Sequence, residues 1–202
     1  MTPATLPALG QTTALIRHRR TIKPDAMDQE RSVDRGLLLE LLENATWAPT
    51  HGCTEPWRFF VFEEQARYRL AEALQAFYRE STPLEMFRED KLRKLGETPL
   101  RAPVVIACVM ERRGGDKIPE LEEIEAVASA LQNFMLSATA AGLGSFWSTA
   151  PLLETAEFKT WLGIRTEDRC LGLMYLGWPK PDLVWPRSVR QPIESRITWH
   201  HD

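Results

Sequence analysis

The sequence predicts an α+β fold, and three observations carry that prediction. Two apolar runs of strand length, residues 103–110 and 170–177, indicate strands that are buried on both faces of a sheet. Several other segments show apolar residues at helical spacing. Strands and helices do not alternate regularly along the chain, as they would in a doubly wound fold. Helices packed on a sheet are therefore expected.

The chain begins with a segment for which no helix or strand is expected. Residues 1–11 are rich in proline and alanine and are expected to form a flexible leader, followed by one domain over residues 12–202. Thr12 or Thr13 is expected to cap a short helix that ends near Arg20.

The next elements follow from amphipathic spacing and composition. Leucines at helical spacing predict a helix over residues 34–45, with Asp34 as its N-cap. The aromatic and β-branched run at 57–62 predicts a strand, and a helix over 65–79 follows it. Residues 81–102 are charged and carry no clear pattern.

The C-terminal half contains a long helix and ends in an extended arm. Residues 120–141 have apolar positions on more than one face, which predicts a buried helix closed by Gly142. A strand is expected after Gly144, and a helix over 152–162. Four prolines between residues 179 and 199 predict an extended arm.

Composition excludes several classes of function. The 202 residues are 44% apolar and carry a net charge of −3, so no general attraction to nucleic acid or to an anionic membrane is expected. No run of apolar residues is long enough for a membrane helix. Three cysteines cannot all pair, and Cys108 and Cys170 lie in apolar strand-like runs, which favours a cytoplasmic location.

A basic segment at the end of the first helix is a candidate phosphate clamp. Arg19 and Arg20 carry planar guanidinium groups that bind phosphate in a bidentate manner, Thr21 adds a hydroxyl, and Lys23 adds a further cation. The alternative is a solvated basic helix end, which the helix dipole alone favours.

A polar loop bracketed by prolines is the second candidate site. His51, Cys53 and Glu55 alternate in it. One alternative is a zinc site, but the sequence lacks a second pair of ligands for it. Another is a Cys–His nucleophile pair, but residues so close in sequence do not easily adopt the geometry of a base and its nucleophile. An ordinary polar turn and a loop that lines a ligand pocket remain as interpretations.

Taken in order, these segments resemble the FMN-dependent nitroreductase family, especially its small single-domain members. The resemblance spans residue 15 to the C-terminus and rests on five loose motifs in the right order. They are Arg19-Arg20-Thr21 with Lys23, Ala48-Pro49-Thr50 leading into Glu55-Pro56-Trp57-Arg58-Phe59, Gly142-Leu143-Gly144 before Trp147-Ser148-Thr149, Leu173-Met174-Tyr175-Leu176-Gly177, and Arg190-Gln191-Pro192-Ile193-Glu194.

The resemblance implies a homodimer with a mainly antiparallel central sheet, an FMN at each subunit interface and tails that wrap the partner. It places the FMN phosphate and ribityl chain at Arg19, Arg20, Thr21 and Lys23, with a further phosphate contact from Arg190. The loop with Pro49, Thr50, His51 and Cys53 would reach the partner's flavin, and Trp147, Ser148 and Thr149 would lie along the isoalloxazine.

The activity implied is NAD(P)H oxidation by a ping-pong hydride transfer through flavin N5, with nitroaromatics, quinones or similar small molecules as acceptors. FMN supplies the redox chemistry, so no catalytic side chain and no metal are expected. Two alternatives stay open: a flavin-binding or flavin-delivering protein with little turnover, and a cysteine hydrolase built on Cys53 and His51.

Overall fold

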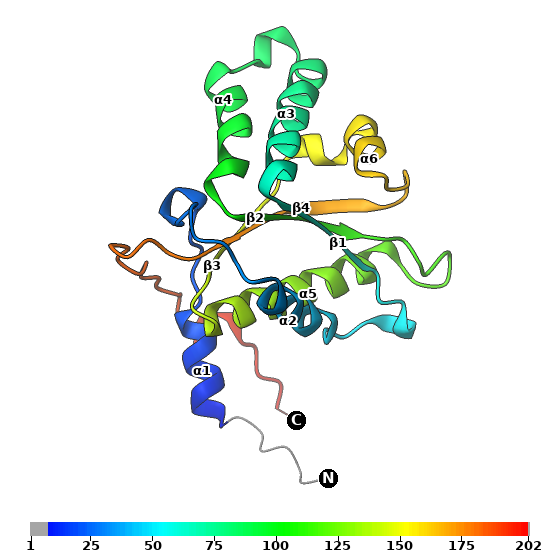
Figure 1. The fold of residues 1–202 in the computed structure, drawn as a ribbon. Coiled ribbons are helices and arrows are strands. Elements are labelled where there is room, and N and C mark those ends of the chain that lie inside the picture. The colour runs from blue at the N-terminus through cyan, green and yellow to red at the C-terminus, as the bar shows by residue number, and fades with distance from the viewer. Residues whose placement is uncertain (1–7, 202) are drawn as a thin grey trace.

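The computed structural model describes residues 8–201, and it confirms the α+β class (Figure 1). Residues 1–7, most of the expected leader, lie outside the described residues. The strands are β1 (Trp57–Glu63), β2 (Val104–Met110), β3 (Gly144–Ser148) and β4 (Arg169–Gly177). The helices are α1 (Leu9–His18), α2 (Arg35–Thr46), α3 (Glu64–Ser81), α4 (Glu89–Glu97), α5 (Glu120–Ala140) and α6 (Ala156–Leu162).

The four strands form one antiparallel sheet in the order β1-β2-β4-β3. Every residue of β2 is buried, which confirms the prediction of a central strand over residues 103–110. Because β2 has no exposed face, helices have to cover the sheet on both sides.

The two faces of the sheet have separate hydrophobic cores. Ile106 and Cys108 point into the core shared with α2 and α5, whereas the next residues along the strand, such as Ala107, point into the core shared with α3 and α6. Figure 1 shows α2 and α5 below the sheet and α3, α4 and α6 above it. Cys108 and Cys170 are buried, as expected for thiols that act as small apolar side chains.

Two helix boundaries differ from the expectation. Helix α1 begins at Leu9 and not at Thr12, because the Ala8 amide donates to the Gln11 side chain 3.1 Å away and closes the first turn. The helix expected over 152–162 is divided into a 3₁₀ turn and α6 at Thr155, whose extended backbone lets its hydroxyl accept from the Phe158 amide.

The caps predicted for the two helices below the sheet are confirmed. The Asp34 carboxylate accepts from the Leu37 amide at 3.0 Å and starts α2. Gly142, with φ at 81°, follows the end of α5 in the left-handed region. The segment 81–102, for which the sequence carried no pattern, contains α4 between two 3₁₀ turns.

A β-bulge in β4 fixes the orientation of Trp147. The pairing between β2 and β4 shifts at this point, so that Leu171 has no partner in the ladder, and Gly172 has φ of 138°. The free Leu171 carbonyl accepts a hydrogen bond from the Trp147 indole at 2.9 Å. A Cβ on Gly172 would lie 2.5 Å from the Trp147 Nε1 atom and 2.6 Å from the Ser148 carbonyl. The bulge therefore makes room for the indole.

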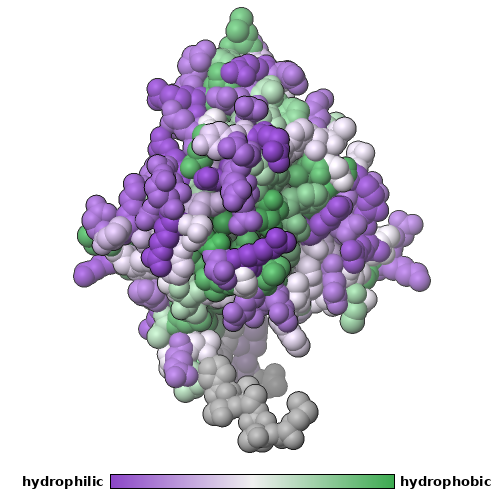
Figure 2. All heavy atoms as spheres, in the orientation of Figure 1, coloured by the Kyte–Doolittle hydropathy of each residue, from purple (hydrophilic) through white to green (hydrophobic). Residues whose placement is uncertain are grey.

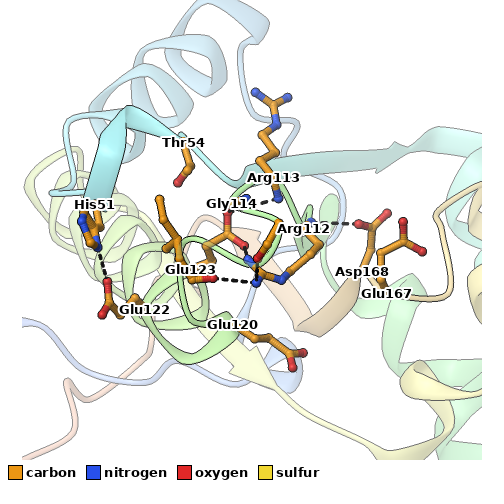
Figure 3. A network of polar contacts seen from close by, with 12 residues as sticks. His51, Thr54, Arg112, Arg113, Gly114, Glu120, Glu122, Glu123, Glu167 and Asp168 are labelled. Atoms are coloured by element: carbon orange, nitrogen blue, oxygen red, sulfur yellow. Dashed lines mark hydrogen bonds and ion pairs between the residues drawn. The ribbon is translucent and has the colours of Figure 1, made fainter.

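A network of charged side chains holds the loop between β2 and α5 (Figure 3). Glu123, buried in the first turns of α5, pairs with Arg112 and accepts from the Arg113 and Gly114 amides. Asp168, equally buried before β4, accepts from the Arg112 amide at 2.9 Å. The loop, α5 and β4 are thus joined through two carboxylates.

Asp168 also binds Arg165, both through its amide at 2.9 Å and through its guanidinium at 2.7 Å. Burial alone raises the pKa of Asp168, but the hydrogen bonds from Arg165 and from the Arg112 amide outweigh burial, and the pKa lies below its ordinary value. The carboxylate is therefore ionised in the folded protein at neutral pH.

The surface is largely hydrophilic on the face shown in Figure 2, with a group of hydrophobic residues over the region where β1 runs. At this edge of the sheet, Val61 is exposed. None of the helices within residues 8–201 combines the length and the apolar character that crossing a membrane requires.

Replacing Asp168 with asparagine is expected to lower the free energy of unfolding by about 3 kcal/mol, because the donors around it lose their charged acceptor. In the parent protein the stabilisation by Asp168 is complete above its unfolded pKa of about 3.9 and is lost as the pH falls through the lower folded pKa. Urea denaturation between pH 3 and pH 7 measures both effects. The neighbouring Glu167→Gln, which changes an exposed ion pair, is the control and should stay within about 0.5 kcal/mol; equal values for the two variants would contradict the prediction.

Replacing Gly172 with alanine is expected to displace the Trp147 indole and to reduce stability by about 2 kcal/mol. Gly163→Ala is a matched control, since Gly163 also has positive φ, at 75°, but has no atom within 4 Å of the added Cβ. Near-ultraviolet circular dichroism and urea denaturation should show a larger change for Gly172→Ala. An equal change in both variants would mean that backbone strain alone, and not the contact with Trp147, sets the cost.

Candidate functional site

The basic segment after α1 lies along the open edge of the sheet. Thr21 forms a parallel bridge with Ser145 of β3, and the Ile22 amide donates to the Ser145 carbonyl at 3.0 Å. Ile22 is buried, whereas Thr21 and Lys23 on either side of it are exposed. The segment is therefore held as a short edge strand that anchors through Ile22.

A basic cavity lies between the end of α1, the middle of α5 and the C-terminal arm. It has a volume of about 620 Å³, and Arg17, Arg19, Arg20 and Arg190 line it. Gln132 of α5 and Ser188, Gln191 and Ile193 of the arm also contribute. The structure thus brings together three of the predicted phosphate ligands, Arg19, Arg20 and Arg190, from segments 170 residues apart in the chain.

The charges in this cavity repel one another. The pKa of Arg19 is lowered, first by burial and then by the neighbouring charges of Arg20 and Arg190. No carboxylate of the described residues lines the cavity. An anion bound here would therefore relieve repulsion between the guanidinium groups.

Arg20 has a second role that the sequence did not indicate. Its guanidinium donates to the Arg17 and Arg19 carbonyls, both at 2.6 Å, and so satisfies free carbonyls at the C-terminal end of α1. Its Nε atom is buried and has no partner among the described residues. The Arg19 guanidinium makes no such backbone contact among the described hydrogen bonds, and it lines the same cavity.

The residues at the far end of β3 lie apart from this cavity. Trp147 uses its indole N–H for the Leu171 carbonyl, so its ring and the backbone are what it offers to a ligand. Thr149 lines a separate cavity of about 420 Å³ together with Ile124, Arg169 and Leu171. Ser148 is half-buried between them.

The polar loop that contains His51 is strained. Gly52, Cys53 and Glu55 all have positive φ, at 61°, 53° and 45°. The Thr50 hydroxyl holds the loop by its contact with the Thr54 hydroxyl at 3.0 Å and by accepting from the Glu55 amide at 3.3 Å. Pro49 and Cys53 are exposed.

The loop is attached to the first turn of α5. His51 Nδ1 lies 2.5 Å from the Glu122 carboxylate, and Gly52 packs so close to Ile118 that a Cβ would lie 2.8 Å from its side chain. The charged network around Glu123 therefore positions the surface on which this loop rests (Figure 3).

The loop and the basic cavity do not meet within one chain. Glu122 and Gln132, which mark the two places on α5, are ten residues apart, or about 15 Å along the helix. None of residues 49–53 lines the cavity that contains Arg19.

The described residues provide neither the ligand set of a zinc site nor a hydrogen bond between Cys53 and His51 for a cysteine hydrolase. Within residues 8–201, no three His, Cys, Asp or Glu side chains gather as metal ligands. His51 pairs with Glu122, and among the described hydrogen bonds there is none between His51 and Cys53.

Sequence reasoning missed Gln132 and Arg17 as lining residues of the basic cavity. The signal for Arg17 was its place in the last turn of α1, next to the clamp. Gln132 carries no signal, since it is one polar residue in a long helix.

Comparison with known proteins assigns the family. The model of the nitroreductase family matches residues 16–178. The chain is 29% identical over 185 residues to the Bacillus subtilis protein named "Putative NAD(P)H nitroreductase YfhC", with 91% of each chain covered.

Two solved structures have the same fold. A nitroreductase-like family protein from Bacillus cereus is 25% identical with a TM-score of 0.79, over 98% of this chain and 100% of the other. The FMN-dependent nitroreductase NfnB from Mycobacterium smegmatis, solved in complex with NADPH, is 20% identical with a TM-score of 0.72, over 96% and 100% of the two chains. The family model covers most of the chain, and the chain therefore belongs to the nitroreductase family.

Proposed function

We propose that this protein is an FMN-dependent NAD(P)H oxidoreductase that reduces nitroaromatics, quinones or similar electron-poor small molecules. The observation that carries the proposal is the cavity lined by Arg19, Arg20 and Arg190 at the edge of the sheet. Family membership supports it, as do the names of the relatives, which include an NAD(P)H nitroreductase and an FMN-dependent enzyme solved with NADPH.

The residues in the basic cavity fit the phosphate of FMN. A phosphate monoester carries about −1.5 to −2 charge at neutral pH, which suits guanidinium groups that otherwise repel one another. Arg19 and Arg190 would bind the phosphate, and the unpartnered Nε atom of Arg20 would add a donor. Thr21 and Lys23 flank the same segment and would extend the contacts along the ribityl chain.

Strand β3 supports a flat ring system next to that phosphate. Trp147 and Thr149 are two and four residues beyond Ser145, the partner of Thr21, which corresponds to about 7–13 Å along the strand. An extended ribityl chain bridges a separation of this order. Trp147, Ser148 and Thr149 would then lie along the isoalloxazine, with Trp147 held by the Leu171 carbonyl.

The loop with Pro49, Thr50, His51 and Cys53 would complete the site of a second subunit in a homodimer. Its position at the first turn of α5, about 15 Å along the helix from the basic cavity, supports this assignment. The helices below the sheet and the arm also expose large apolar side chains that a partner would cover, namely Trp47 (80%), Leu121 (62%) and Trp199 (73%). Sedimentation of the protein at micromolar concentration tests the dimer.

When bound, FMN supplies the redox chemistry by accepting two electrons from NAD(P)H and passing them to the acceptor. The side chains of this protein would bind and orient it. The proposed chemistry, which FMN supplies, needs no side chain as a catalytic acid or base. The same arrangement would serve a flavin carrier with little turnover, and only a kinetic measurement separates that alternative from an enzyme.

The purified protein is expected to show the absorption of oxidised flavin, or to acquire it when FMN is added. Rapid mixing of the FMN form with NADPH or NADH should bleach this absorption quickly, because a catalyst must be reduced by its donor. A flavin carrier would bind FMN but bleach slowly. Absence of FMN binding would contradict both functions.

Replacing Arg19 with glutamine is expected to weaken FMN binding by about 10- to 100-fold, the equivalent of one lost charge-assisted contact. Arg20→Gln should weaken binding and also lower stability by about 1 kcal/mol, because it removes the cap of α1. Equilibrium titration with FMN and urea denaturation measure the two effects. Arg35→Gln changes an exposed arginine outside the cavity and is the control. If Arg19→Gln bound FMN as tightly as this control, the assignment would be contradicted.

A further inference from the structure

A second cavity adjoins the one that contains Arg19. It has a volume of about 600 Å³ and shares Arg17, Arg20 and Ser188 with the first cavity. Its own members include Arg187, from the C-terminal arm, and His18, from the end of α1. The two cavities therefore form one continuous basic surface between α1 and the arm.

This surface carries more positive charge than one phosphate requires. Five arginines line the two cavities, Arg17, Arg19, Arg20, Arg187 and Arg190, and no carboxylate does so among the described residues. None of the ion pairs within residues 8–201 involves any of the five. With Arg19 and Arg190 assigned to the flavin phosphate and Arg20 capping α1, Arg17 and Arg187 are left without an anion.

The second cavity also has a fixed aromatic wall. The rings of His18 and Trp185 are stacked with centroids 4.9 Å apart and planes within 2° of parallel. The Trp185 indole donates to the His18 carbonyl at 2.8 Å, which locks the pair. His18 is exposed, so its ring is accessible beside the guanidinium groups. Aromatic faces next to arginines are suited to stacking of a nucleobase.

We propose that the second cavity binds the phosphate of a phosphorylated adenosine, with Arg17 and Arg187 on the phosphate and the His18–Trp185 stack beside the base. Two molecules could place such a phosphate here: NADPH, through the 2′-phosphate that NADH lacks, and FAD, through the adenylate phosphate that is joined directly to the flavin phosphate. The proposal rests on the proposed function, because it takes the first cavity as the flavin phosphate site. It predicts that Arg187 distinguishes nucleotides with and without this second phosphate.

The first arm of the test uses 2′-phospho-ADP-ribose, which has the phosphorylated adenosine of NADPH but no nicotinamide. FMN-loaded full-length protein is titrated calorimetrically with this probe and with ADP-ribose. If NADPH is the source, the 2′-phosphorylated probe should bind at least about tenfold more tightly, and Arg187→Gln should abolish the difference. Arg17→Gln, as a second variant, should reduce it.

The second arm titrates flavin-free protein with FMN and with FAD. If FAD is the source, it should bind about tenfold more tightly than FMN, and Arg187→Gln should bring both flavins to the same affinity. Arg196→Gln is the matched control, since this exposed arginine lies on the same arm but lines neither cavity.

A preference that disappears in Arg187→Gln in either arm supports the proposal and names the source. Equal behaviour of Arg187→Gln and Arg196→Gln in both arms overturns it. If the parent protein binds FMN but Arg187 has no effect, this inference alone fails. If the parent protein does not bind FMN, the proposed function fails.

Discussion

The two-sided burial of β2 is the constraint on which the rest of the structure depends. With no exposed position on that strand, the chain must supply a helical layer for each face, and the two cores meet only through the sheet. The helices α2 and α5 cover one face, and α3 and α6 cover the other. Strand β3 is left at the edge, where its free backbone pairs with the segment around Thr21. The candidate site lies at this edge because helices cover both faces of the central strands.

Helix α5 links the two halves of the candidate site. Its middle contributes Gln132 to the basic cavity, and its first turns hold His51 through Glu122 and the preceding loop through Glu123. Since a helix of this length is rigid, the cavity and the His51 loop are kept apart by a fixed distance. In the homodimer proposed above, the His51 loop of one copy would meet the basic cavity of the other copy, so the two parts of the site would come together despite this separation.

Arg19 and Arg20 show how neighbouring residues of one type take different roles. In the sequence they form one pair of cations. In the structure, both line the cavity that contains Arg190, but only the Arg20 guanidinium also closes the end of α1. Trp147 is a similar case: the family resemblance implied a place along the isoalloxazine, and the bulge at Gly172 explains how its indole is held.

The sequence by itself determined the fold class, the central strand and the caps at Asp34 and Gly142, because each depends on hydrophobic spacing or on a local hydrogen bond. It also located Arg19, Arg190 and the His51 loop as candidate segments. Only the tertiary structure decided which of them share a cavity, that Thr155 divides a predicted helix, and that Arg17, Arg187 and Gln132 belong to the same surface. Those facts depend on contacts between segments far apart in the chain, and no local pattern records such contacts.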